Sequence, residues 1–518
     1  MLRAFLLVLF ALPLVFQQPA SFDLIVANGR LLDGSGNPWR RADVGIRRGR
    51  IEAVGDLSGA RAVRVVDAGG RLVTPGFIDV HSHAVESLTR DALRDARALV
   101  AQGVTTVVGN PDGGGPVDLA AQRTSLEAGG MGVNVALLVG HGSVRASVMG
   151  QADRAPTAEE LARMESLVRR AVSDGAYGLS SGLFYAPGSF AKLDEVVALA
   201  RAAGGVYASH IRDEANYSIG VMAAVQEVID VADRARVRGI VTHVKALGPD
   251  NWGLGGAIAT RIDLARARGI EVLADQYPYA ASSTSLGAAL VPRWAQAGGA
   301  DAFRARLADA ESRARIIAEM RQNVRRRGGA RSIVIASHRP DRALEGQSLD
   351  QIAEARGKAP ELAALDMVEA GGASIVSFNM SEDDIAALMR KPWTMASSDG
   401  GLALPGEGKP HPRNNGAFTR KLTHYVRERG VVSLEEAIRS MTSLPAATFA
   451  LDGRGIIASG AAADIAIFDL AALREGPTYD DPHRLSEGMW MVLVNGTAVI
   501  EDGAFTGRRP GLMLRRAP

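Results

Sequence analysis

The alternation of short apolar runs with helical stretches, from about residue 74 to residue 451, constrains the fold more than any other feature of the chain. The apolar runs include GVTTVVGN, VNVALLVGH and GIVTHVKA, and stretches such as AEELARMESLVRRAVSDG lie between several of them. Strands that alternate with helices form parallel sheets, and over this length a (β/α)8 barrel is the leading candidate. More than eight runs look like strands, and an Arg- and Ala-rich stretch near 286–331 predicts a helical insertion late in the barrel. Which late runs close the barrel stays open.

The two ends of the chain share a different texture. Residues 21–73 and 452–518 are β-rich runs punctuated by Asn-Gly, Asp-Gly and Gly-Gly turns. The segment VANGRLLDG near the N-terminus is nearly repeated by LVNGTAVIEDG near the C-terminus. We therefore expect both ends to form one small β-sandwich beside a barrel that spans residues 74–451.

The first 20 residues predict a signal peptide. One early arginine is followed by an apolar run over residues 4–16 and then by small and polar residues. This run is too short to cross a bilayer comfortably and fits a secretory leader that is cleaved near Ser21. We expect an exported protein, periplasmic or secreted, without a membrane span after cleavage. An uncleaved anchor or a wrongly assigned start of the sequence remains the alternative.

Charge and cysteine content exclude several kinds of partner and site. The 59 basic and 57 acidic residues leave a formal net charge of +2, which indicates no nucleic-acid footprint. Cysteine is absent, so disulfides, thiolate ligands and cysteine nucleophiles are excluded. Charge alone does not identify the partner, and the oligomeric state is left open.

Histidines at the ends of apolar runs predict a metal centre. His81 and His83 close the first run of TPGFIDVHSHAVE, and residues i and i+2 of a strand point to the same side. His210 closes VYASH, His243 closes IVTH and Asp399 closes TMASSD. Barrel enzymes place catalytic residues at these strand ends. Imidazole with carboxylate is a ligand set for zinc, and Asp399 beside a metal-bound hydroxide would shuttle the proton.

Two other patterns receive a structural interpretation. Four further histidines are expected to have structural or loop roles: His141, His338, His411 and His424. The segment GLSSG matches the nucleophile elbow of serine hydrolases at Ser180, but that elbow needs a helix directly after the serine. Pro187 and Gly188 break any helix there, so a serine-hydrolase mechanism is rejected.

Several longer motifs resemble one enzyme family. TPGFIDVHSH, YGLSSGLFYAPGSF, YASHIRDE, DQYPYAASSTSL, SSDG and HPR are similar to motifs of the D-aminoacylases, or N-acyl-D-amino-acid deacylases, of the metal-dependent amidohydrolase superfamily. The resemblance runs from about residue 23 to residue 511. It implies a (β/α)8 barrel that carries the metals and a small β-sandwich built from both termini.

The resemblance also implies roles for individual residues. His81 and His83 would bind a more exposed metal together with Asp399, while His210 and His243 would bind a tighter one. Lys245 would contact the substrate carboxylate, and Arg413 is a further candidate for that contact. One tyrosine of DQYPY, Tyr277 or Tyr279, and one serine of ASSTS, Ser283 or Ser285, would assist substrate and oxyanion binding.

The chain departs from the family at one ligand. Typical members place a cysteine ligand after GVTTVVGN, where this chain has Pro111. Asp112 follows in a glycine-rich loop and would supply a carboxylate instead, although a turn-forming role is the open alternative. The number of Zn2+ ions, one or two, depends on this residue.

The predicted activity is hydrolysis of the linear amide bond of N-acyl-D-amino acids to a carboxylate and a free D-amino acid. The attacking group would be metal-bound hydroxide, and Asp399 would pass its proton to the departing amine. Selectivity for the D form follows from the resemblance alone. An exported dipeptidase or a cyclic amidase of the hydantoinase or dihydroorotase type would use the same metals. A non-catalytic binding protein of the same fold is a further alternative.

Overall fold

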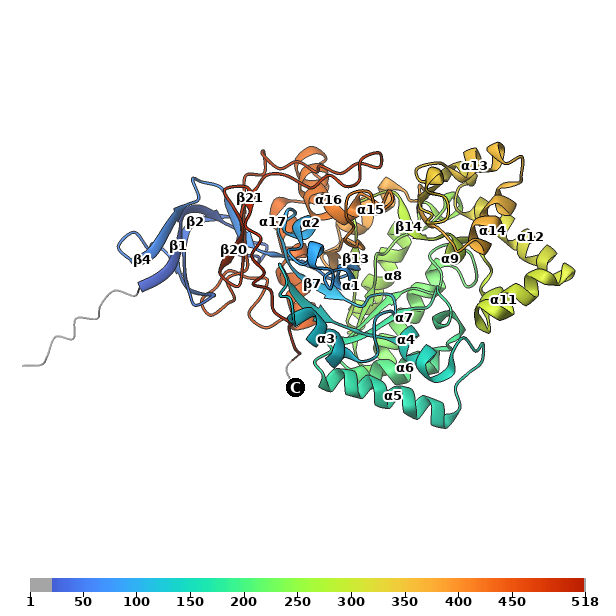
Figure 1. Ribbon diagram of the computed structural model, residues 1–518. Coiled ribbons are helices and arrows are strands. Elements are labelled where there is room, and N and C mark those ends of the chain that lie inside the picture. Colours follow the sequence, from blue (N-terminus) through green and yellow to red (C-terminus); the bar gives the residue numbers. More distant parts are fainter. Residues whose placement is uncertain (1–20, 517–518) are drawn as a thin grey trace, which may run out of the picture.

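The computed structural model describes residues 21–516, so the predicted signal peptide lies outside the described residues. Within this range, no helix combines the length and the apolar character that a bilayer crossing requires. A strand-rich domain lies at one end, the barrel is in the middle, and a largely helical insertion lies at the opposite end (Figure 1).

The barrel is built from parallel strands in two hydrogen-bonded sets. The set β6-β7-β8 continues into the set β9-β10-β11-β12-β13-β17 because β8 and β9 are separated only by Leu138 and act as one strand. The ends of β17 and β6 meet where Asp399 N donates to His81 O at 2.9 Å. This closes an eight-position barrel and confirms the predicted fold class. The strands are β6 (Phe77–Asp79), β7 (Val104–Gly109), β8 (Asn134–Leu137), β9 (Val139–Gly140), β10 (Gly178–Gly182), β11 (Val206–His210), β12 (Arg238–Val241), β13 (Val272–Gln276) and β17 (Thr394–Ala396).

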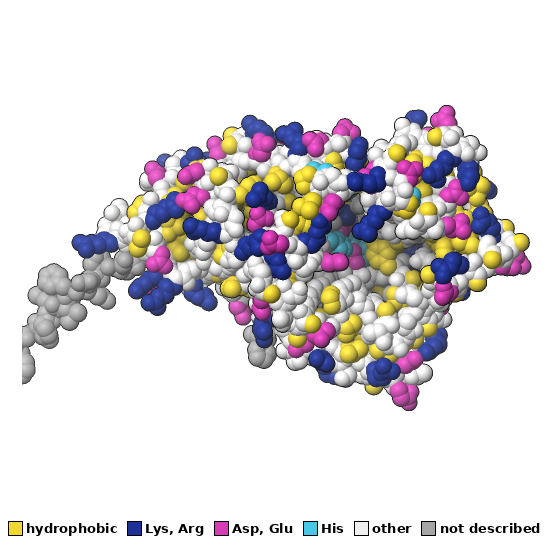
Figure 2. Space-filling model, viewed as in Figure 1, with side chains coloured by type: hydrophobic (Ala, Val, Ile, Leu, Met, Phe, Trp, Pro, Cys, Tyr) yellow, Lys and Arg dark blue, Asp and Glu magenta, His cyan; other side chains and the backbone are white. Residues whose placement is uncertain are grey.

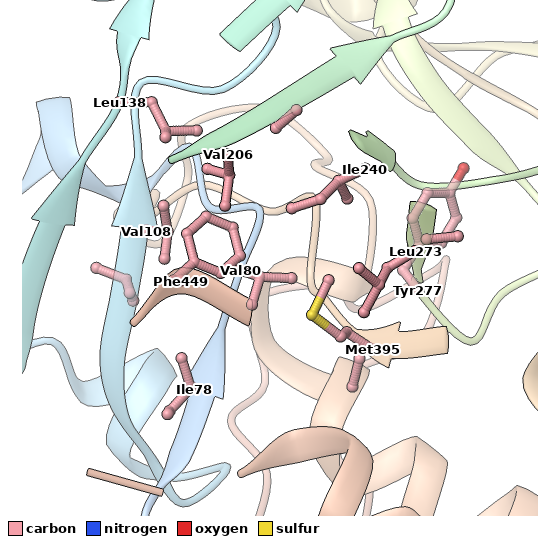
Figure 3. Packing of buried hydrophobic residues seen from close by; sticks show 14 of the residues in the cluster. Ile78, Val80, Val108, Leu138, Val206, Ile240, Leu273, Tyr277, Met395 and Phe449 are labelled. Carbon is pink, nitrogen blue, oxygen red and sulfur yellow. The ribbon is translucent and has the colours of Figure 1, made fainter. Parts of the chain in front are cut away.

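Amphipathic helices cover the outside of the barrel. The helix α5 (Ala158–Ser173) begins where Thr157 and Glu160 form a reciprocal capping box, and it buries Met164, Val168 and Ala171. Side chains from several strands meet inside the barrel, so its interior is a packed core (Figure 3). The other long outer helices are α6 (Leu193–Ala203), α7 (Val221–Ala235) and α8 (Gly255–Ala267).

Both ends of the chain build one nine-stranded sheet. The predicted sandwich is therefore a single hydrogen-bonded sheet, in which β5 pairs antiparallel with β18 and joins the two halves. The halves share one buried apolar cluster that includes Val44, Ile46, Ile465 and Leu493. Its strands are β1 (Ser21–Leu31), β2 (Arg40–Arg47), β3 (Arg50–Gly55), β4 (Arg61–Asp67), β5 (Leu72–Pro75), β18 (Ile465–Phe468), β19 (Met489–Val494), β20 (Thr497–Glu501) and β21 (Ala504–Phe505).

The last residues leave this sheet and return to the barrel, which differs from the predicted β-domain range of 452–518. Val135 of β8 donates to Leu512 O at 2.9 Å, and Leu514 N donates back to Val135 O at 2.8 Å. Arg123 caps this contact by donating to Leu514 O at 2.8 Å. The C-terminal segment thus occupies the hydrogen-bonding groups beside β8, where the two barrel strand sets meet.

The insertion between β13 and β17 is larger than the predicted stretch of 286–331. It contains a three-stranded antiparallel sheet in the order β14-β16-β15, so the runs SIVIASH and ASIVSFN belong to it and not to the barrel. A separate apolar cluster that includes Ile316, Met320 and Ile333 holds it together. Its elements are β14 (Ser282–Ser285), α9 (Leu286–Leu290), α10 (Arg293–Gln296), α11 (Gly299–Ala308), α12 (Ala310–Arg326), β15 (Ile333–Ser337), α13 (Leu349–Ala355), α14 (Pro360–Glu369) and β16 (Ser374–Ser377).

Candidate metal centre

The carboxyl ends of the barrel strands bring together six side chains that could bind metal ions. In one group, the ligand atoms of His81, His83, Asp112 and Asp399 all lie within 4.8 Å of one another. In a second group, Asp112, His210 and His243 do the same. Asp112 belongs to both groups, so the arrangement offers two adjoining sites with a shared carboxylate.

His81, His83 and His243 lie beyond the strand ends at which the sequence predicts them. β6 ends at Asp79, so His81 and His83 lie in the following loop, and strand alternation does not explain their common direction. β12 ends at Val241, and His243 lies beyond it with a left-handed backbone (φ 35°). The loop conformations, rather than the strands, aim these imidazoles at the centre.

The distances show how closely the groups converge. His81 Nε2 lies 3.3 Å from Asp112 Oδ1, and His83 Nε2 lies 3.4 Å from Asp112 Oδ2 and 3.3 Å from Asp399 Oδ1. His243 Nε2 lies 3.5 Å from Asp112 Oδ1. Four buried atoms of the candidate ligands have no hydrogen-bond partner among the described residues: His81 Nε2, Asp112 Oδ1 and both ring nitrogens of His210. Buried polar atoms are normally satisfied, so this donor set fits divalent metal ions.

A strained loop presents Asp112 to both sites. Asn110 and Asp112 adopt left-handed backbone conformations, with φ of 59° and 56°. Ser180 of β10 holds the loop, because its hydroxyl donates to Asn110 O at 2.6 Å and accepts from Gly113 N at 3.1 Å. Ser180 is fully buried and bonded to backbone, which agrees with the rejection of a serine nucleophile.

Asp79, the last residue of β6, anchors Ser398, the residue before Asp399, where the barrel closes. Its carboxylate accepts hydrogen bonds from Ser398 N at 2.9 Å and from Ser398 Oγ at 2.5 Å. Asp399 itself has a left-handed backbone with φ of 49°, directly after this anchored serine. The carboxylate therefore enters the centre from a backbone that is fixed on both sides.

The pKa values of His83 and His210 are shifted in opposite directions. Desolvation alone would lower the pKa of His83, whose side chain is 43% exposed, but hydrogen bonds to Asp112 and Asp399 raise it to about 10, and a bound metal ion would displace this proton. Burial lowers the pKa of His210 to about 3, so this imidazole is neutral at pH 7 and has a lone pair to offer. Burial would raise the pKa of Asp399, yet Arg413 and His243 hold it well below its usual range. Asp399 is therefore ionised at neutral pH.

The centre opens into a cavity of about 760 Å³ that is lined by Tyr277, Ser283, Lys245 and Arg413 as well as by His83 and Asp399. Histidine side chains are visible in a hollow between the barrel and the insertion (Figure 2).

Contacts in the structure distinguish the two tyrosines of DQYPY and the two serines of ASSTS. Tyr279 donates to Glu475 Oε1 at 3.0 Å, and Ser285 caps α9 by accepting from Ala288 N at 3.1 Å. Neither Tyr279 nor Ser285 lines the cavity.

Both predicted carboxylate-binding cations have acidic partners. Arg413 Nη1 lies 2.7 Å from Asp399 Oδ2. Lys245 Nζ lies 2.5 Å from Glu214 Oε1 and 2.7 Å from His243 Nδ1. Glu214 is a residue that sequence reasoning missed, although it closes the motif YASHIRDE four residues after His210. It orients His243 and Lys245 at once.

The four histidines that were expected to be structural have partners away from the metal-binding groups. His141 Nε2 lies 3.0 Å from Glu195 Oε1, and His424 Nδ1 lies 3.1 Å from Glu428 Oε2. His338 bonds to Gly372 O at 2.9 Å, and His411 bonds to Ala281 O at 3.0 Å. These contacts are consistent with structural roles.

Comparison with known proteins gives consistent matches over nearly the whole chain. The profile of the Amidohydrolase family matches residues 64–500, a range that contains both ligand groups. D-aminoacylase of Alcaligenes xylosoxydans xylosoxydans is 36% identical over 523 residues, which cover 96% of this chain and 98% of that protein.

Two solved structures are also similar. N-acyl-D-glutamate deacylase from Bordetella bronchiseptica, complexed with zinc and a phosphonate mimic of the tetrahedral intermediate, matches with a TM-score of 0.82 and 35% identity. A D-aminoacylase studied for the role of its binuclear metal centre matches with a TM-score of 0.81 and 33% identity. Each match covers 96% of this chain and 100% of the solved one.

Proposed function

The chain belongs to the amidohydrolase family, and on this premise we propose that it is a metal-dependent deacylase of N-acyl-D-amino acids. The reaction is hydrolysis of the linear amide bond, with a carboxylate and a free D-amino acid as products. The observation that carries the proposal is the convergence of four histidines and two aspartates at the floor of a cavity lined by cations. The relatives that share the fold at 33–36% identity are enzymes of this kind.

Six side chains would hold the metal ions. His81, His83 and Asp399 would hold one Zn2+, His210 and His243 would hold a second, and Asp112 would contribute to both sites in place of the family's cysteine. The unpartnered buried atoms of His81, Asp112 and His210 support this assignment. A bound divalent ion would polarise the scissile carbonyl and supply a water acidic enough to attack at neutral pH.

Asp399 acts as the proton carrier. Its carboxylate is ionised at neutral pH and is oriented by Arg413 on Oδ2 and by His83 near Oδ1. It accepts a proton from the attacking water and delivers it to the departing nitrogen. Because Asp399 is buried, is paired with Arg413 and directly follows Ser398, which Asp79 anchors, it needs no reorganisation during this transfer.

Tyr277 and Ser283 donate hydrogen bonds to the substrate. Burial raises the pKa of Tyr277 above its usual value, so its hydroxyl keeps its proton at working pH. Arg413 lies over the ring of Tyr277 at 4.5 Å and fixes its position. Lys245 and Arg413 lie beside the metal-binding groups, where the carboxylate next to the scissile nitrogen would reach them.

We also propose that the protein acts outside the cytoplasm. This proposal rests on the apolar run of residues 4–16 and the small residues that follow it. An exported deacylase of this kind would meet D-amino acid derivatives from cell-wall turnover.

The test uses the chain from residue 21 onward, produced with zinc. Racemic N-acetyl-methionine is supplied with and without a chelator, and the free amino acid is followed by chiral chromatography. Release of D-methionine alone, abolished by the chelator and by Asp399→Asn, is the expected result. Turnover restricted to dipeptides or hydantoins would replace this proposal with the dipeptidase or cyclic amidase alternative. Zinc-loaded protein without any turnover would indicate a binding protein.

A further inference from the structure

We propose that the candidate metal centre takes hard and borderline divalent ions, Mn2+ and Co2+ as well as Zn2+, and that Asp112 makes it discriminate against the soft ion Cd2+. This inference rests on the ligand assignment of the proposed function, not on its substrate, and goes beyond it by naming the class of ion. Among the described residues, Asp112 is the one side chain that both ligand groups contain, so its chemistry acts on both sites.

Every candidate ligand atom is a nitrogen or an oxygen. The two groups contain four imidazoles and two carboxylates, and the chain has no cysteine. None of the described residues that line the cavity at the centre is a methionine. Soft ions are selected by thiolate and thioether sulfur, whereas carboxylate suits Mn2+ and imidazole suits Zn2+ and its neighbours. Neither ligand group therefore has the donor that would favour a soft ion.

Both carboxylate oxygens of Asp112 face candidate ligands. Its Oδ1 lies 3.5 Å from His243 Nε2, in the second group, and its Oδ2 lies 3.4 Å from His83 Nε2, in the first. Asp399 differs, because Arg413 Nη1 lies 2.7 Å from its Oδ2 and leaves its Oδ1 to face His83 at 3.3 Å. Asp399 thus offers one oxygen to one group. Asp112 offers two, and is the hard donor that can serve both ions.

Close packing of glycines keeps Asp112 in this place. A Cβ atom at Gly182, the last residue of β10, would lie 2.2 Å from Asp112 O. A Cβ atom at Gly140, the last residue of β9, would lie 2.1 Å from Gly114 O. Within the loop, Gly114 N donates to Pro111 O at 2.9 Å and closes a turn around Asp112. These contacts need no ion, so the carboxylate is a donor that the fold holds in position before metal binding.

The number of donors leaves room for further ligands. The first group offers four protein donors and the second offers three. The centre opens into the cavity of about 760 Å³, and the side chain of His83 is 43% exposed. Mn2+ favours octahedral, oxygen-rich coordination, while Zn2+ is commonly four-coordinate. An open set of three or four protein donors imposes neither geometry, so ions of both preferences can be accommodated.

The experiment compares ion selectivity in the wild type and in Asp112→Cys, both produced from residue 21 onward. Metal-free protein is dialysed against equimolar Zn2+ and Cd2+, and the bound ions are counted by mass spectrometry. The wild type should bind Cd2+ no more tightly than Zn2+. Asp112→Cys should raise the affinity for Cd2+ relative to Zn2+ by about 10- to 100-fold and gain the ultraviolet charge-transfer absorption of a cadmium–thiolate bond. Mn2+ or Co2+ alone should load the wild type with as many ions per chain as Zn2+ does.

The control adds a thiol away from the centre. Asp118→Cys changes the exposed N-cap of α3 (Leu119–Glu127) and should keep the selectivity of the wild type. If Asp112→Cys does not fold, the wild type alone decides, because a preference for Cd2+ of more than about tenfold, or a failure to load with Mn2+ and Co2+, would overturn the inference. Metal-loaded Asp112→Cys with wild-type selectivity and without the new absorption would overturn it as well.

The outcome is separable from that of the proposed function, because none of these measurements uses a substrate. Absence of turnover on N-acyl-D-amino acids would overturn the proposed function and leave the ion selectivity standing. Wild-type protein that binds no divalent ion would overturn both.

Discussion

Replacement of Ser180 by alanine tests how the structure builds its metal centre. The hydroxyl of Ser180 forms hydrogen bonds with Asn110 O and Gly113 N, and these bonds hold the loop that carries Asp112. Without them, the metal-free loop can relax from the left-handed conformations of Asn110 and Asp112, which cost about 1 kcal/mol or more each. Metal binding would then have to restore the strained loop conformation and bury Asn110 O and Gly113 N again without their hydrogen-bond partner.

The magnitude follows from these contributions. Two buried backbone groups lose their partner, and a lost hydrogen bond of this kind costs about 1–3 kcal/mol. Allowing for partial relaxation, the metal affinity of Ser180→Ala should fall by about 1–3 kcal/mol, which is roughly 5- to 140-fold at 1.4 kcal/mol per factor of ten. Competition with a zinc-binding dye measures this change directly.

Ser181→Ala is the matched control. Ser181 is the next residue of β10, is equally buried, and bonds to Tyr207 OH at 2.8 Å and Ser209 Oγ at 3.0 Å instead of to the Asp112 loop. Its replacement should affect stability and leave zinc affinity unchanged. Wild-type zinc affinity in Ser180→Ala would refute the loop-holding role. Complete loss of turnover at full zinc occupancy would instead favour Ser180 as a nucleophile.

Three further predictions follow from charged groups. Asp112→Asn removes the carboxylate shared by both ligand groups, so the dialysed protein should retain at most one zinc ion per chain by mass spectrometry. Asp118→Asn, at an exposed helix cap, is the control. An unchanged zinc content in Asp112→Asn would make Asp112 a turn residue only. Glu214→Gln leaves Lys245 buried without its partner and should lower the free energy of unfolding in urea by about 3–5 kcal/mol, whereas Glu407→Gln at the exposed pair with Arg90 should change it by less than about 1 kcal/mol. Burial lowers the pKa of Lys421 from 10.5 to about 7. Between these two pH values the unfolded chain holds a proton that the folded chain lacks, so the free energy of unfolding rises with pH. Lys421→Met should remove that rise, which amounts to about 5 kcal/mol, and an unchanged pH slope in thermal unfolding would contradict this account.

The regular part of the fold could be predicted from the sequence because it depends on local patterns. The alternation of apolar runs with helical stretches predicts a parallel barrel, and the turn-rich ends predict a shared β domain. The insertion boundaries could not be predicted this way. β15 and β16 look like barrel strands, and only their antiparallel pairing and their own apolar cluster separate them from β17.

The sequence by itself determined which residue types stand at or just beyond the strand ends, and hence the metal-ligand set that we propose: His81, His83, His210, His243 and Asp399. Tertiary structure decided which side chains share one space. From the sequence alone, Asp112 is equally well a turn residue or a ligand. In the structure, its left-handed backbone and the loop contacts of Ser180 bring its carboxylate close to both groups. Tyr277 was separated from Tyr279, and Ser283 from Ser285, in the same way, because only Tyr277 and Ser283 line the cavity. The physical reason is that composition and periodicity act over neighbouring residues, whereas a site is formed by loops whose direction depends on contacts between distant segments.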